Sequence, residues 1–160
     1  MTLHATCLDI DGKGVLIEGR PGTGKSDLAL RLIDQPGRGI LDGSPKSARL
    51  VADDQVVVRR VGERLLASPP ERLRGLIEIR GLGILKIPYC PETILRLIVT
   101  GQVDDIERLP QASDMIGKIL ETCLPRISLD LKAASAPARV RAALDALSVD
   151  EANVISTTPY

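Results

Sequence analysis

The sequence has almost no aromatic residues: it contains two tyrosines and neither phenylalanine nor tryptophan. Proteins that hold single-stranded nucleic acid stack its bases on aromatic side chains, and two tyrosines are too few for such a platform. The chain also lacks an excess of positive charge, because 21 Lys and Arg balance 21 Asp and Glu. Neither nucleic acid nor an anionic membrane surface is therefore an expected partner.

Long apolar runs are missing as well, since none approaches the ~20 residues of a membrane span. The N-terminus, MTLHATCLDIDGKG, has no basic region followed by an apolar core, as a secretion signal would. At 160 residues the chain has the length of one domain that can bury its own core. We therefore expect a soluble cytoplasmic protein with no membrane partner.

The three cysteines, Cys7, Cys90 and Cys123, lack the paired spacing of a zinc site and are odd in number. Their apolar surroundings predict buried, reduced thiols.

Apolar, β-branched runs bounded by glycine, proline or charge predict strands over 3–10, 14–18, 50–58, 76–80, 83–87, 94–100 and 127–131. Helical spacing predicts helices over 25–34 and 137–147, and a less regular pattern predicts a third over 112–121. This mixed order indicates a single α/β domain over 1–147 with a C-terminal tail over 148–160. The segment 34–49, rich in Gly, Pro, Ser and charge, is expected to be a long exposed loop, either disordered or a lid.

A phosphate-binding loop of the form G-x-x-x-x-G-K-[ST] is matched by the residues Gly19-Arg20-Pro21-Gly22-Thr23-Gly24-Lys25-Ser26. The strand-like GVLIE precedes this stretch and the helix-like SDLALRLI follows it, as such a loop requires. Lys25 would contact the β- and γ-phosphates, and the Ser26 hydroxyl would ligate Mg²⁺. The motif predicts ATP or GTP binding, with a simple helix-capping turn as the alternative. It does not identify the reaction, because switches, motors and kinases share it.

Two candidate acidic sites follow. Asp53 and Asp54 come directly after an apolar strand, where P-loop proteins commonly keep an acid near the metal. Side chains alternate along a strand, so only one of the two would face the phosphates if the strand stays regular. A polar turn is the alternative interpretation.

The stretch LIEIRGLGILKI, 76–87, carries Glu78 and Arg80 on one face of a predicted strand. A carboxylate there could hold metal and a guanidinium could hold phosphate. Gly81 and Gly83 would let the backbone approach a ligand or another chain. A solvated hairpin with an ion pair fits these residues equally well.

Two further residues carry little signal by themselves. His4 is the single histidine and lies near the start of an apolar strand, which fits a structural role. Arg108, in the acidic stretch DDIERLP, fits a surface charge.

The order of these pieces, namely LHATCLDI, GRPGTGKS, RLVADD and LIEIRGLGILKI, resembles the catalytic domain of bacterial HPr kinase/phosphorylase over about residues 3–132. The resemblance implies a P-loop kinase core related to that of phosphoenolpyruvate carboxykinase. It implies phosphorylation of a serine of the phosphocarrier protein HPr with ATP and Mg²⁺, and in many members phosphorolytic removal of that phosphate. It also implies a homo-oligomer, a hexamer in the family, and a short form without the N-terminal domain of long members.

Carried over residue by residue, the resemblance implies that Lys25 contacts phosphate, that Ser26 and Glu78 hold Mg²⁺, and that Asp54 is the acid/base. His4 and Arg108 become active-site residues. Accessory roles are implied for Asp53, Arg80, Gly81, Gly83 and Lys132.

The sequence departs from the family at three places. Pro21 stands where serine is usual and lacks an N–H, which predicts weaker ATP binding. The segment 34–49 is longer than the family's link. DLKAASA, 130–136, replaces the basic PVRPGR and retains only Lys132 as a cation, which predicts weak phosphorylase activity. Two alternatives stay open: an ATP-sensing regulatory module that transfers no phosphate, and a small-molecule kinase on the same core.

Overall fold

The computed structural model of the chain describes residues 1–101, 104–149, 152 and 154–158. The large sheet consists of β1 (Thr2–Leu3), β2 (Thr6–Ile10), β3 (Lys13–Glu18), β6 (Ala48–Ala52), β7 (Val56–Val61), β8 (Arg64–Ser68), β11 (Thr93–Gly101), β12 (Ile116–Ile119) and β13 (Thr122–Leu129). Separate hairpins are formed by β4 (Gly37–Arg38) with β5 (Pro45–Lys46), β9 (Leu76–Ile79) with β10 (Gly83–Lys86), and β14 (Leu147–Val149) with β15 (Ile155–Thr157). The helices are α1 (Lys25–Asp34) and α2 (Ala136–Ala146), with 3-10 turns η1 (Glu71–Leu73) and η2 (Ala112–Met115).

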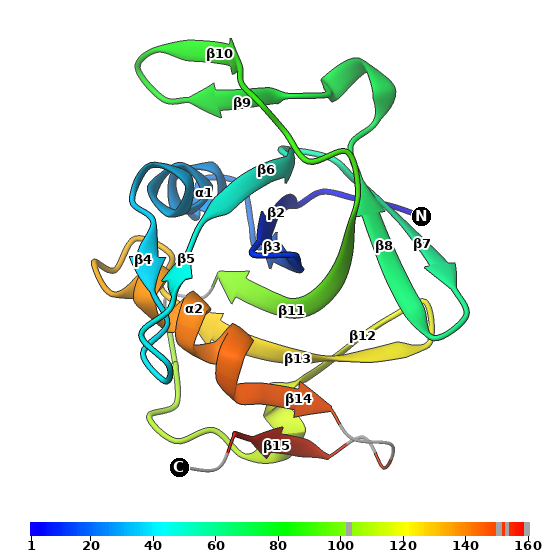
Figure 1. Cartoon of the computed structure of the whole chain (residues 1–160), viewed down its shortest axis with the longest axis vertical. Coiled ribbons are helices and arrows are strands. Elements are labelled where there is room, and N and C mark those ends of the chain that lie inside the picture. Colours follow the sequence, from blue (N-terminus) through cyan, green and yellow to red (C-terminus); the bar gives the residue numbers. More distant parts are fainter. Residues whose placement is uncertain (102–103, 150–151, 153, 159–160) are drawn as a thin grey trace.

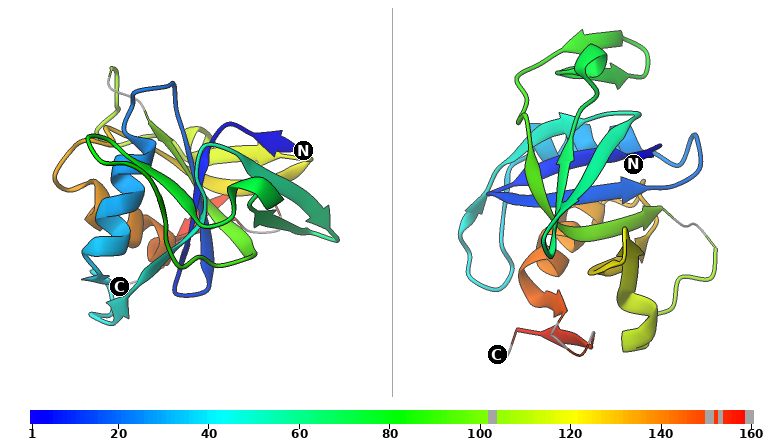
Figure 2. Two further views of the ribbon diagram at one scale, coloured as in Figure 1. Left: turned by 90° about the horizontal axis from the view of Figure 1, so that it is seen from above. Right: turned by 90° about the vertical axis from the view of Figure 1, so that its right-hand side faces the viewer.

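This is a mixed α/β fold with a curled sheet and both α-helices on one side of it (Figure 1). The hairpin β9–β10 projects from one end, and β14–β15 lies at the other (Figure 2). Within the described part of the chain, no helix reaches the length and hydropathy needed to cross a membrane.

Strand β11 joins the two halves of the sheet. Its first residues pair antiparallel with β8, and Thr93 lies opposite Ala67. Its last residues pair in parallel with β3 on one edge and β13 on the other, so that Val99 lies between Ile17 and Ile127. The carboxyl ends of β3, β11 and β13 therefore meet at one edge of the sheet. The loop that follows β3 departs from this edge.

The central strands β2, β3 and β11 are largely buried on both faces, which explains why their sequences are mostly apolar. On the helix side, Ile17 of β3 belongs to the same core as Leu28 of α1 and Val140 of α2. On the other side, Leu16 packs in a second core with Val56. Alternation along a strand sends neighbouring residues to different cores.

Two of the three predicted helices are confirmed, as α1 and α2. Both sequences carry an apolar stripe, and α2 has proline in its first turn, where the missing N–H costs no hydrogen bond.

The helix predicted over 112–121 is wrong. Only Ala112–Met115 turns, as η2, and Ile116–Ile119 forms β12, which pairs antiparallel with β13. Leu120 and Glu121 have φ angles of 46° and 65°, so they make a tight hairpin turn that a helix cannot contain. Pairing with β13 outweighs the local helical preference of these residues and decides the structure here.

The long loop predicted over 34–49 is also wrong in part, because it contains the hairpin β4–β5. Lys46 is buried, and its Nζ lies 3.4 Å from Asp145 Oδ1 of α2 and 3.6 Å from Asp42 Oδ2. The hairpin lies at the carboxyl end of α1, whereas residues 19–24 lie at its amino end (Figure 1). It is therefore not a lid over the phosphate-binding loop.

The predicted tail over 148–160 contains part of the hairpin β14–β15, in which Ser148 pairs with Ser156. The backbone N–H of Thr158 donates to Ala146 O at 2.9 Å. Residues 150, 151, 153, 159 and 160 lie outside the described residues. The domain boundary at residue 147 stays a prediction.

The cysteines are free thiols. Cys7 and Cys90 are buried, as predicted, while Cys123 is only half-buried. Burial raises the pKa of the Cys7 thiol, so this side chain stays uncharged and unreactive.

Candidate functional site

Residues 19–26, here called the cradle, turn sharply between the end of β3 and the start of α1. Gly22 and Gly24 have φ angles of 82° and 99°, a region open to glycine. Thr23 donates its backbone N–H to Arg20 O at 3.2 Å and its hydroxyl to the same oxygen at 2.8 Å. These bonds tighten the turn. The predicted sequence of strand, loop and helix is confirmed.

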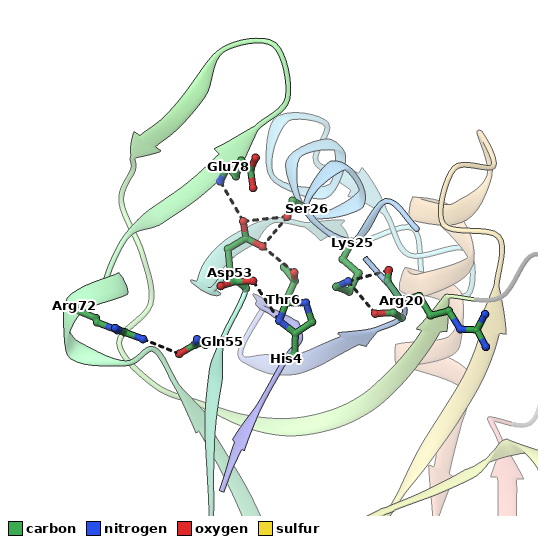
Figure 3. Close-up of polar contacts among 11 residues, drawn as sticks. His4, Thr6, Arg20, Lys25, Ser26, Asp53, Gln55, Arg72 and Glu78 are labelled. Carbon is green, nitrogen blue, oxygen red and sulfur yellow. Dashed lines mark hydrogen bonds and ion pairs between the residues drawn. The ribbon is translucent and has the colours of Figure 1, made fainter. Parts of the chain in front are cut away.

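Lys25 is the first residue of α1 and is only 8% exposed. Its Nζ donates to Gly19 O at 2.9 Å and to Arg20 O at 3.2 Å (Figure 3). An ionised phosphate oxygen accepts a stronger hydrogen bond from an ammonium than a peptide carbonyl does. The buried ammonium of Lys25 is thus held inside the cradle, where an anion would compete for it.

The electrostatics at the entrance to the cradle involve Glu18, the last residue of β3. Burial raises the pKa of this carboxyl, and the positive charge of Arg126 partly opposes the shift. A raised pKa favours the neutral form of this carboxyl, which reduces the negative charge beside the cradle.

The cradle opens into a cavity of about 840 Å³, a size that suits a nucleotide. The predicted site residues that line it are Pro21, Gly22, Gly24, Lys25 and Ser26 of the cradle, with His4, Asp53, Asp54, Glu78, Arg80 and Lys132. Segments far apart in the sequence therefore meet at one cavity.

Asp53 accepts hydrogen bonds from three residues and is only 5% exposed. The Ser26 hydroxyl lies within hydrogen-bond distance of both of its oxygens, 2.8 Å from Oδ1 and 3.0 Å from Oδ2. The Thr6 hydroxyl donates to Oδ1 at 2.8 Å, and the backbone N–H of Glu78 donates to Oδ2 at 3.1 Å (Figure 3). One buried carboxylate thus links α1, β2 and the projecting hairpin.

Asp54 lines the cavity too. The prediction of a single strand over 50–58 is wrong, and the break between two strands explains this position of Asp54. Strand β6 ends at Ala52, β7 begins at Val56, and Asp54 has a φ angle of 68°. The interruption abolishes the alternation that would have turned one aspartate away. Asp54 Oδ1 lies 3.3 Å from His4 Nδ1, and their side chains are 63% and 55% exposed. An incoming group can therefore reach both.

The hairpin β9–β10 forms one wall of the cavity. In Figure 3 the Glu78 side chain lies close to Asp53 and Ser26. Strand β9 ends at Ile79, so Arg80 lies in the turn rather than on the predicted strand, although it lines the same cavity. Gly81 and Gly83 have φ angles of 85° and 109°, which the hairpin turn requires.

Lys132 lines the same cavity as this hairpin. A Cβ placed on Gly24 would lie 3.2 Å from Lys132 Cγ, so the lysine stem packs directly on the cradle. Arg31 of α1 secures this turn by donating to the carbonyls of Leu131 and, at 3.1 Å, Ala133. The sequence gives no signal for Arg31, since it stands four residues after Asp27, in the spacing of an ordinary helix-surface ion pair.

Arg108 does not line this cavity. It is exposed and lies in the segment between β11 and η2. Its neighbours Glu107 and Pro110 line a second cavity of about 610 Å³, formed with β13 and α2.

The oxygen atoms that could hold a metal at the cradle belong to Ser26, Asp53 and Glu78. Within the described residues, no three His, Cys, Asp or Glu side chains cluster as a metal site of their own. Magnesium commonly takes one or two carboxylates and completes its shell with waters and substrate phosphates. The donor set fits an ion that is bound together with a phosphate ligand.

Comparison with known proteins supports the resemblance drawn from the sequence. The family model described as "HPr Serine kinase C-terminal domain" matches residues 1–143. The HPr kinase/phosphorylase of Geobacillus thermodenitrificans is 33% identical over 144 residues, which cover 81% of this chain and 42% of that protein. That of Clostridium tetani is 34% identical over 114 residues, which cover 70% of this chain and 34% of that protein. The chain thus spans less than half the length of these relatives.

A solved structure shares the architecture. The Hpr(Ser) kinase/phosphatase from Coxiella burnetii superimposes with a TM-score of 0.67 at 27% identity, covering 88% of this chain and 91% of that one. The mixed α/β fold with its curled sheet is therefore found in this group of proteins.

Proposed function

This chain belongs to the HPr serine kinase C-terminal domain family, and on that premise we propose that it transfers the γ-phosphoryl group of ATP to a serine of HPr. One observation carries the proposal: the buried ammonium of Lys25 and the exposed carboxylate of Asp54 line the same cavity. A phosphate-binding group and a candidate base thus lie within reach of one ligand.

The cradle would bind the triphosphate. The N–H groups at the start of α1 would donate to the anion, and Lys25 would exchange its contacts with Gly19 and Arg20 for phosphate oxygens. Pro21 contributes no N–H, so the cradle has one donor fewer than the usual loop.

Magnesium would be held by Ser26 and Glu78. A serine hydroxyl has one proton to donate and two lone pairs. Because that proton is directed at Asp53, the lone pairs of Ser26 are left for a cation. When bound, the metal neutralises charge that builds up on the phosphate oxygens.

Asp54 would act as the base. As the oxygen of the HPr serine forms its bond to the γ-phosphorus, the bond from that phosphorus to the β–γ bridging oxygen breaks and ADP leaves. The serine proton passes to the Asp54 carboxylate. His4, 3.3 Å from Asp54, would orient this carboxylate.

We extend the proposal to the remaining expectations from the family. They are a P-loop kinase core related to that of phosphoenolpyruvate carboxykinase, a catalytic domain over 1–147, a cytoplasmic location and a homo-oligomer, a hexamer by resemblance. Arg108, which does not line the cradle cavity, would reach an active site through such an assembly or a movement of its segment.

The proposal is tested by incubating the purified protein with ATP, Mg²⁺ and HPr and measuring phosphoserine by mass spectrometry. We expect serine phosphorylation that requires all three components. Binding of ATP without any phosphoserine would favour the ATP-sensing module, which the missing N–H at Pro21 also favours. Phosphate transfer to a small metabolite in place of HPr would favour a small-molecule kinase.

The reverse reaction is predicted to be weak. Phosphoserine-HPr incubated with inorganic phosphate should release little pyrophosphate, because Lys132 is the single cation of 130–136 and a second phosphate must be held against the charge of the first. Pyrophosphate can be measured with a coupled enzymatic assay. Release as fast as the forward reaction would show that this turn needs no further cations.

A further inference from the structure

Thr6 is a polar residue in an apolar stripe. Strand β2 places Thr6, Leu8 and Ile10 on the same face, and Leu8 and Ile10 belong to the core beneath α1. Thr6 lies opposite Ile17 of the same core and is completely buried. A valine of almost the same shape would fill this position without a hydroxyl to satisfy.

The Thr6 hydroxyl has one described partner, the Asp53 carboxylate. The distance from Thr6 Oγ1 to Asp53 Oδ1 is 2.8 Å, and both groups are buried. Figure 3 shows Thr6 pointing from β2 toward Asp53, on the opposite side from Glu78. A hydrogen bond to a buried carboxylate is stronger than one between neutral groups and sets the direction of the carboxylate.

The orientation of Asp53 in turn decides what Ser26 can do. Ser26 directs its proton at Asp53, which frees its lone pairs for a cation bound with the nucleotide. If Asp53 rotates, the Ser26 hydroxyl follows or loses its acceptor. Groups that orient a metal ligand in this way commonly change metal affinity by 10- to 100-fold when they are removed.

We propose that Thr6 is a positioning residue that fixes Asp53, and through it the Ser26 hydroxyl, for the binding of Mg·ATP. The inference rests on the proposed binding of nucleotide at the cradle. It does not depend on the identity of the phosphate acceptor.

The test compares Mg·ATP binding by the wild-type protein and Thr6→Val, using isothermal titration calorimetry. We expect Thr6→Val to weaken binding by about tenfold, at the lower end of the range for such groups. Thr6→Ser, which keeps the hydroxyl, should restore most of the affinity. With EDTA in place of Mg²⁺, the difference between wild type and Thr6→Val should shrink, because the lost orientation matters for the cation.

The chain offers a matched control in Thr93. This threonine is also buried, and its hydroxyl donates to Asp9 Oδ2 at 2.6 Å, away from the cradle cavity. Thr93→Val removes an equivalent buried bond and should leave the affinity for Mg·ATP unchanged. Thermal unfolding without nucleotide shows whether each variant is folded. If Thr6→Val does not fold, Thr6→Cys replaces it, with the same weakened binding expected from its poorer donor.

Three results would overturn the inference: wild-type affinity in Thr6→Val, an equal loss in Thr93→Val, or no binding of Mg·ATP by the wild type. Wild type that binds Mg·ATP but leaves HPr unmodified would contradict the proposed kinase alone. The comparison of Thr6 variants would then still decide the role of Thr6.

Discussion

Replacing Lys25 by methionine is expected to reduce phosphoserine formation on HPr by about 100- to 1,000-fold, the usual cost of removing one preorganised electrostatic group from an active site. Methionine fills the channel of the lysine stem but cannot donate to phosphate. The Nζ that now contacts Gly19 O and Arg20 O is the buried cation of the cradle, whereas the other cationic residue of this loop, Arg20, is exposed. Initial rates by mass spectrometry, with ATP binding measured in parallel, check the prediction.

Lys46→Met is the matched control, because Lys46 is also a buried lysine held by fixed acceptors. It pairs with Asp145 of α2, and neither residue lines the cradle cavity. The control should lower the unfolding temperature and leave the rate per folded molecule near that of the wild type. If Lys25→Met kept a rate within about threefold of wild type, the cradle would not be the catalytic phosphate site.

Asp54→Asn is expected to lower the rate of transfer by about 100- to 10,000-fold, the range attributed to a general base. Binding of Mg·ATP should be retained, since the structure gives Asp54 no contact with Ser26 or Lys25 and leaves 63% of its side chain exposed. Asparagine tolerates the positive φ of this position, so the backbone should not change. The measurement is the rate at saturating ATP together with the affinity for ATP.

Asp11→Asn controls for the chemistry of the substitution. Asp11 is exposed and has a φ angle of 52°, but it lies in the turn between β2 and β3. This variant should match the wild type in rate and stability. Serine phosphorylation that persists at the wild-type rate in Asp54→Asn would refute the role of Asp54 as base.

The sequence predicts the parts of the site that are set by neighbouring residues. The cradle, the strand before it and the helix 25–34 are all correct, because glycines, Lys25 and the apolar stripe of α1 act within a few residues of one another. The glycines of the β9–β10 turn are recognised for the same reason. The family resemblance adds His4, which no local pattern singles out.

The errors occur where distant segments decide the structure. Residues 116–119 become a strand because β13 pairs with them. Asp53 and Asp54 share the cavity because the extended conformation is interrupted between β6 and β7. The links from Asp53 to Thr6, Ser26 and Glu78 join residues 20 or more positions apart. No spacing rule reports such contacts before the fold is known.

The position of β11 has a consequence for how the protein matures. This strand pairs with β8 through its first residues and with β3 and β13 through its last, so it completes both halves of the sheet. Its partner β3 lies some eighty residues earlier, and closing so long a loop is slow and entropically costly. In a nascent chain that ends before β11, the strand that leads into the cradle, β3, is paired only with β2. We therefore expect the sheet edge that carries the cradle to be completed only after β11 has been synthesised.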